Sequence, residues 1–102
     1  MKIVAITACG TGIAHTYMSA EGLKKAAKEM GDEIRVEIQG AMGIEYGLTE
    51  EEIEAADLVI IASDIGVRGR ERFENKKVIE MDPGDIIGNP LKEYKKAMAN
   101  LK

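Results

Sequence analysis

The sequence predicts one α/β domain over residues 1–102, with an open four-stranded parallel sheet and helices on both faces. Strand-like apolar runs alternate with helical patterns along the chain, which favours parallel strands joined by right-handed crossovers. Two of the runs, "KIVAITA" and "LVIIA", are apolar almost throughout, as expected for strands that are buried on both faces. Together these observations predict a sheet enclosed between two layers of helices.

The first half of the chain predicts two strands and one long helix. The first strand is expected over residues 2–8, followed by a glycine-rich turn. Apolar residues then recur every three or four positions from Ile13 to Met30, which predicts one face of an amphipathic helix. Gly31 is expected to end that helix. Residues 34–38 alternate between apolar and polar types, which predicts a strand nearer the edge of the sheet.

The second half of the chain also alternates between predicted helices and predicted strands. A capping box of Thr49 and Glu52 predicts a short helix over about residues 50–56. Buried strands are expected at residues 58–62 and 77–81, and the second of these is expected to end at the turn residues 82–84.

The remaining predictions concern a final helix, two irregular segments and the order of the strands. The pair Asn89-Pro90 predicts the start of a final helix. The segments 41–48 and 65–76 are expected to be largely irregular. We expect the four strands, numbered along the chain, in the order 2-1-3-4, which is a Rossmann-like arrangement.

Composition and charge narrow the range of functions. The formal net charge is −4 and no block of basic residues occurs, so nothing in the sequence points to nucleic acid. The single cysteine excludes an internal disulfide and a cysteine-based zinc cluster, and we predict neither a metal nor a cofactor. No apolar run approaches the roughly 18 residues of a membrane span, so we expect no direct membrane insertion. The arginines at 68, 70 and 72 are expected on a solvated loop.

The functional edge of the sheet follows from the predicted topology. In open α/β sheets, ligands bind beyond the carboxyl ends of the strands. The residues expected there are Cys9-Gly10, Gln39-Gly40, Ser63-Asp64 and Asp82-Pro83. We expect Asp64 and Gln39 to support the loop that carries the cysteine.

That loop, "CGTGIAHT", has the composition of an anion site. A glycine-rich turn between a strand and a helix presents several backbone N–H groups to one point, and the helix adds partial positive charge there. The same field favours the thiolate of Cys9, which is the nucleophilic form of the side chain. A phosphoryl group that is attacked by this thiolate would meet N–H donors already in place.

Spacing separates two kinds of phosphate chemistry. A cysteine-dependent phosphatase has the frame Cys, five residues, Arg, then Ser or Thr. Here His15 stands in the arginine position and Thr16 follows. The planar fork that grips phosphate in hydrolysis is therefore missing, which favours transfer over hydrolysis. Two alternatives stay open: a phosphatase with Asp82 as general acid, and a non-enzymatic thiol-based regulatory module.

The loop resembles the active-site loop of the fructose-type enzyme IIB component of the bacterial sugar phosphotransferase system. The similarity continues through "VEIQG", "LTEEEIEAADLVIIASD" and "RF" at Arg72-Phe73. The resemblance implies that Cys9 is phosphorylated by a phosphohistidine of a IIA partner. It also implies that the group passes to a sugar, most simply fructose, bound by a membrane-embedded IIC partner. Such a component is cytoplasmic and associates with the inner face of the membrane through IIC.

The resemblance also assigns roles within the loop. The phosphate-binding residues would be Gly10, Thr11, Gly12, Ile13, Ala14, His15 and Thr16. Two positions depart from the family pattern: Gly10 replaces a familiar proline, and Tyr46 stands where asparagine is common. Glycine supplies a backbone N–H that proline lacks, at the cost of a more flexible turn. Met42, between small residues, is expected to be an exposed contact for a partner.

Overall fold

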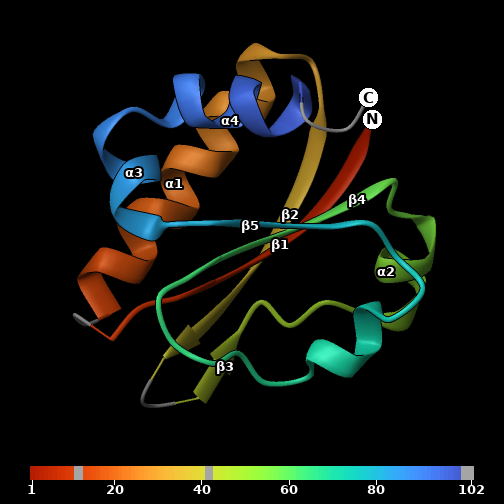
Figure 1. Ribbon diagram of the computed structural model, residues 1–102. Helices are drawn as coiled ribbons and strands as arrows, with labels where there is room; N and C mark the ends of the chain where they lie inside the picture. Colours follow the sequence, from red (N-terminus) through yellow and green to blue (C-terminus); the bar gives the residue numbers. More distant parts are fainter. Residues whose placement is uncertain (11–12, 41–42, 100–102) are drawn as a thin grey trace.

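The protein forms a five-stranded sheet with helices on both of its faces over the described residues, 1–10, 13–40 and 43–99, of the computed structural model (Figure 1). The strands are β1 (Lys2–Ala8), β2 (Glu33–Gly40), β3 (Gly43–Glu45), β4 (Leu58–Ser63) and β5 (Val78–Met81). The helices are α1 (Ile13–Glu29), α2 (Glu50–Ala55), α3 (Pro83–Gly88) and α4 (Pro90–Ala99), with a 3₁₀ helix η1 at Arg70–Phe73.

The sheet is mixed, and its strand order is β3-β2-β1-β4-β5. The strands β2, β1, β4 and β5 are parallel to one another, whereas β3 runs antiparallel to β2. The prediction of four strands in the order 2-1-3-4 is corrected to five strands in the order 3-2-1-4-5, because β3 is added beside β2; the four predicted strands are parallel and keep their relative order as β2-β1-β4-β5. The additional strand β3 has only three residues, which is too short to show an alternating pattern in the sequence.

The two faces of the sheet have separate cores. Successive residues of β1 point to opposite sides, so Ile3 and Ala5 pack in the core beneath α1, α3 and α4. Val4 and Ile6 pack in the core beneath α2 and η1. Both cores are apolar, which explains why β1 and β4 read as continuous apolar runs.

Helix α1 packs on the sheet with the central part of the predicted apolar face, since Ala20, Leu23 and Ala27 are buried. Two other residues of that face, Tyr17 and Met30, are 37% and 42% exposed, whereas the polar residues Thr16 and Ser19 are buried. The hydroxyl of Ser19 donates to the carbonyl of Thr16 at 2.9 Å, so this polar group is satisfied within the helix. Gly31 adopts φ +75° just past the helix, which confirms its predicted role at the C-terminus.

The turn expected after the fourth predicted strand is instead the start of a helix. Asp82 caps α3 by accepting the N–H of Gly84 at 2.8 Å, and Pro83 occupies the first turn. Helix α4 follows directly, and its buried Tyr94 donates a hydrogen bond to Asp32 at 2.6 Å. The C-terminal helix is thereby tied to the segment between α1 and β2.

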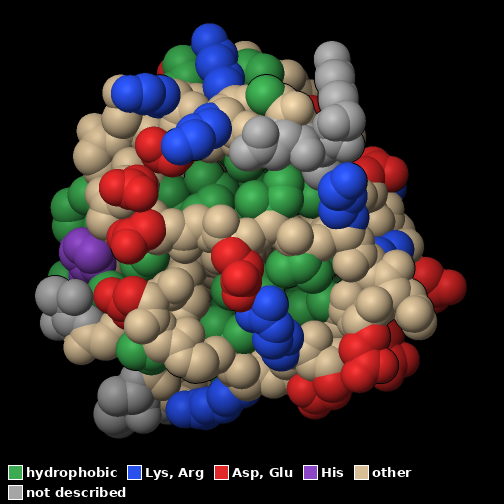
Figure 2. Space-filling view, viewed as in Figure 1, with side chains coloured by type: hydrophobic (Ala, Val, Ile, Leu, Met, Phe, Trp, Pro, Cys, Tyr) green, Lys and Arg blue, Asp and Glu red, His purple; other side chains and the backbone are tan. Residues whose placement is uncertain are grey.

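Charged side chains of both signs are interspersed on the face shown in Figure 2, in line with the net charge of −4. Among the described residues, no helix is long and apolar enough to cross a membrane.

Candidate functional site

A cavity of about 700 Å³ opens at the carboxyl ends of β1 and β2. Its described lining comes from these strand ends, from α1, from β3 and from the loop that follows β4. Cys9, the residue directly after β1, lines this cavity and is 8% exposed. The functional edge predicted from the topology therefore coincides with a concave surface that holds the only cysteine of the chain.

The thiol of Cys9 faces two polar side chains. Its Sγ lies 2.8 Å from Nδ1 of His15, which is in the first turns of α1. It lies 3.4 Å from Oδ2 of Asp64, which follows β4. A thiol held against an imidazole nitrogen has the arrangement of an activated nucleophile.

The register of the sheet explains why Asp64 reaches the loop. Ala8 of β1 is paired with Ser63 of β4, so the residues that follow, Cys9 and Asp64, leave the sheet side by side. The backbone N–H of Gly10 donates to Oδ1 of Asp64 at 2.8 Å. This hydrogen bond is the main cause that lowers the pKa of the Asp64 carboxyl, and the contact with the Cys9 thiol also lowers it. Asp64 is therefore an anion beside the thiol at neutral pH.

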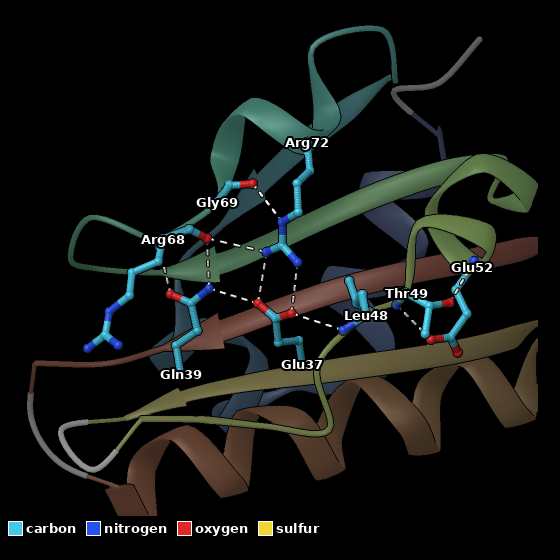
Figure 3. A network of polar contacts seen from close by, with 8 residues as sticks. All are labelled: Glu37, Gln39, Leu48, Thr49, Glu52, Arg68, Gly69 and Arg72. Carbon is cyan, nitrogen blue, oxygen red and sulfur yellow. Dashed lines mark hydrogen bonds and ion pairs between the residues drawn. The ribbon is translucent and has the colours of Figure 1, made fainter.

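A buried ion pair supports the same end of the sheet (Figure 3). Glu37 of β2 is 1% exposed, and Arg72 of η1 donates to both of its oxygens, at 3.0 and 2.9 Å. The N–H of Leu48 also donates to Glu37, at 3.0 Å. Burial alone would raise the pKa of Glu37, but these hydrogen bonds and one from Gln39 outweigh it and leave the pKa lowered.

Gln39 connects this ion pair to the cavity. Its amide nitrogen donates to Glu37 at 2.8 Å and to the carbonyl of Arg68 at 2.9 Å. Its amide oxygen accepts the N–H of Arg68 at 2.8 Å. The loop between β4 and η1 is thus fixed to β2 through both backbone groups of Arg68 (Figure 3).

The arrangement corrects one expectation from the sequence. Arg72 is not on a solvated loop, because it is paired with buried Glu37. No pattern in the sequence indicates this pair, since alternation in β2 is typical of a strand with one solvated face. In the structure, Glu37 and Gln39 on that face are buried and contact η1 and the loop before it, whereas Glu33 and Arg35 are exposed.

The structure brings several of the predicted site residues together around Cys9. Contacts join Cys9, Gly10, His15 and Asp64, and the same cavity is lined by Thr16 and Gln39. Ile13 and Ala14 open α1, and Ala14 is exposed. Thr11, Gly12 and Met42 lie outside the described residues.

Two other residues that the sequence singled out lie apart from the thiol. Asp82 caps α3 and is not among the described lining of the cavity. Tyr46 is 65% exposed, adopts a left-handed backbone conformation with φ 54°, and has Lys24 above its ring. Among residues 1–10, 13–40 and 43–99, no three histidine, cysteine or acidic side chains are placed to hold a metal ion.

Comparison with protein families matches residues 4–97 to the family described as "PTS system, Lactose/Cellobiose specific IIB subunit". The chain is 48% identical over 86 residues to the "PTS system fructose-like EIIB component 2" of Escherichia coli strain K12, a match that covers 84% of this chain and 81% of the relative. It is also 48% identical over 97 residues to the "PTS system fructose-specific EIIABC component" of Bacillus subtilis, which covers 95% of this chain and 15% of that protein.

A solved structure gives the same result. The solution structure of the enzyme IIB subunit of the PTS system from Escherichia coli K12 superposes with a TM-score of 0.89 and is 37% identical; the match covers 98% of this chain and 93% of that one. The chain therefore belongs to the family of enzyme IIB components of the sugar phosphotransferase system and is of the fructose type.

Proposed function

We propose that Cys9 is the phosphoryl carrier of this IIB component. It would accept the phosphoryl group from a phosphohistidine of a IIA partner and pass it to a fructose-like sugar held by a IIC partner at the inner face of the membrane. The observation that carries the proposal is the 2.8 Å contact between Sγ of Cys9 and Nδ1 of His15 at the start of a helix. It gives the thiol a proton acceptor and places the thiolate where a helix favours negative charge.

The first step moves the phosphoryl group from nitrogen to sulfur. The thiol proton goes to Nδ1 of His15, and the thiolate forms a bond to phosphorus. The bond between phosphorus and the donor imidazole breaks, its electron pair stays on that nitrogen, and the imidazole takes up a proton from solvent. The N–H groups at the start of α1 would face the phosphoryl oxygens.

The second step moves the group from sulfur to oxygen. A sugar hydroxyl attacks phosphorus, the bond between sulfur and phosphorus breaks, and its electron pair returns to Sγ. The hydroxyl proton is released to solvent through a base at the sugar site. The carrier ends as a thiolate, ready for the next donor.

Two features favour transfer over hydrolysis. The position of the phosphatase arginine is occupied by His15, whose Nδ1 contacts the thiol. The acid that a phosphatase needs near the leaving group is not supplied by Asp82, which caps α3 instead. The name EIIABC of the Bacillus subtilis relative supports IIA and IIC partners for this chain.

The test is phosphorylation by the partner. After incubation with a phosphorylated IIA protein, we expect an adduct of about 80 Da on Cys9, measured by mass spectrometry of the intact chain and its peptides. The variant Cys9→Ser keeps nearly the same volume and should carry no thiophosphate. An adduct elsewhere, or none under conditions in which a known IIB component is phosphorylated, would refute the proposal.

The two alternatives have different signatures. A phosphatase would turn over an aryl phosphate in a reaction that Cys9→Ser abolishes. A thiol-based regulatory protein would form a sulfenic acid on Cys9 without any response to phosphate. We expect that the protein does not turn over an aryl phosphate and that it does respond to phosphate.

A further inference from the structure

The cavity around Cys9 is poor in positive charge for a site that holds a phosphoryl group. A phosphorylated side chain carries about −1.5 to −2 charges at neutral pH. The ionised Asp64 already lies 3.4 Å from Sγ, and Glu45 lines the same cavity. Among the described lining residues, Arg68 is the one lysine or arginine.

The backbone of Arg68 is fixed, whereas its guanidinium is available. Both backbone groups are bonded to the side-chain amide of Gln39, at 2.8 and 2.9 Å. The guanidinium itself makes neither a hydrogen bond nor an ion pair with any residue in the described part of the chain, and in Figure 3 the side chain extends away from the Glu37–Arg72 pair.

The two neighbouring arginines differ from Arg68 in this respect. Arg70 pairs with Glu80 at 2.8 Å, and Arg72 pairs with buried Glu37 at 2.9 Å. Neither of them is among the described lining of the cavity. Of the three, only Arg68 combines a fixed backbone, a free cationic group and a position on the wall of the Cys9 cavity.

We infer that Arg68 binds the phosphoryl group while it is carried on Cys9 or delivered to it. The inference rests on the proposed function, because it names the residue that balances the charge at that site. A guanidinium binds two phosphate oxygens through its planar fork. Arg68 would supply, from the loop after β4, the cation that the phosphatase frame places at the position of His15.

Gln39 has a supporting part in this arrangement. Its side-chain amide bonds to the backbone of Arg68 and so fixes the segment from which the guanidinium extends. Its own position is fixed by the hydrogen bond to Glu37 at 2.8 Å. Gln39 is therefore a positioning residue, and the buried ion pair stabilises it.

The first experiment measures binding without transfer chemistry. Inorganic phosphate is titrated into the reduced protein at constant ionic strength, and the amide shifts of the cavity residues give a dissociation constant. We expect Arg68→Gln to weaken binding about 10-fold, as for the loss of one charge-assisted hydrogen-bonding group. Arg68→Lys should lose less, because it keeps the charge and loses the fork.

The matched control is Arg70→Gln, which removes the same charge two residues away, at the start of η1. It should leave phosphate binding within about twofold of the wild type, because an exposed charge outside the cavity acts only through a screened field. Equal loss in both variants, or no loss in Arg68→Gln, would overturn the inference. Unchanged amide spectra away from the loop would show that each variant is folded.

The second experiment measures transfer from phosphorylated IIA to Cys9. We expect Arg68→Gln to lower the rate of adduct formation at least fivefold relative to Arg70→Gln, an effect of the same origin as the loss of phosphate affinity. If the adduct forms on Cys9 at the wild-type rate in Arg68→Gln, the inference fails and the proposed function stands. If no adduct forms on Cys9 in the wild type, the proposed function fails, and the phosphate titration alone decides whether Arg68 binds the anion.

Discussion

The backbone N–H of Gly10 donates a hydrogen bond of 2.8 Å to Oδ1 of Asp64, which joins the loop of the thiol to the end of the neighbouring strand. A proline at this position, as is familiar in the family that the loop resembles, has no N–H to donate. The departure from that pattern therefore creates a specific contact. Its N–H serves the carboxylate of Asp64, and not the phosphate cradle.

Gly10→Pro should raise the pKa of Asp64, because the Gly10 hydrogen bond is the main cause that lowers it. The measurement is a titration of the Asp64 carboxyl carbon by NMR. Gly10→Ala is the matched control, since it keeps the N–H and adds a Cβ that meets Ile65 Cγ2 at 3.1 Å, a tight contact. The pKa should move in Gly10→Pro and stay nearly constant in Gly10→Ala; equal values in both would contradict the role of the N–H.

The buried Glu37–Arg72 pair should contribute more to the stability of the fold than an exposed ion pair does. Arg72→Gln leaves buried Glu37 without its bidentate partner and should lower the free energy of unfolding by about 3 kcal/mol. Arg70→Gln breaks an exposed pair with Glu80 and should cost less than about 1 kcal/mol. Urea unfolding at pH 7 measures both, and similar losses would refute the difference in burial as the cause.

The same pair predicts a pH dependence. The pKa of Glu37 is lower in the folded protein than in the unfolded chain, so the unfolded chain binds a proton first as the pH falls. The stability that Glu37 contributes is complete above about pH 4.3 and is lost as the pH falls through the folded pKa. The wild type and Glu37→Gln should therefore differ most above this range and converge below it. A constant difference across the titration would contradict the assignment.

Gln39→Leu should release the loop that carries Arg68. The substitution leaves the N–H of Arg68 without its acceptor and should cost about 2 kcal/mol of stability, because Gln39 is buried. Amide hydrogen exchange at Arg68 should accelerate beyond the change in global stability. The amide of Asp32, bonded to Ala27 at the end of α1, is an internal control that should follow global stability alone.

Tyr94→Phe should remove an alkaline limit on stability. Burial and the hydrogen bond to Asp32 raise the pKa of Tyr94 in the folded protein. Above about pH 10 the unfolded chain loses this proton while the folded protein keeps it, so stability falls as the pH rises. At pH 7, Tyr94→Phe should cost about 1.5 kcal/mol for the lost hydrogen bond. Thermal unfolding at pH 7 and pH 10.5 measures the difference in stability between the wild type and Tyr94→Phe, and this difference should be smaller at pH 10.5.

Several elements could be predicted because their signals are local. The capping box of Thr49 and Glu52 is formed as expected, with both hydrogen bonds present. The buried strands β1 and β4 carry apolar residues throughout and are recognised by composition alone. The short edge strand β3 was missed, because three residues carry too little periodicity to be detected. The helix α3 was missed, because the Asp82-Pro83-Gly84 segment that begins it is also typical of a turn.

The nature of the candidate site can be read from the chain alone: a lone thiol on a glycine-rich turn between a buried strand and a helix, with His15 where a phosphatase has arginine. Which distant groups join the thiol depends on the tertiary structure. Asp64 reaches Gly10 because β1 and β4 pair in register, and Arg68 reaches the cavity because Gln39 fixes its backbone. Contacts between residues 29 or 54 positions apart depend on strand pairing, and no local pattern along the chain encodes them.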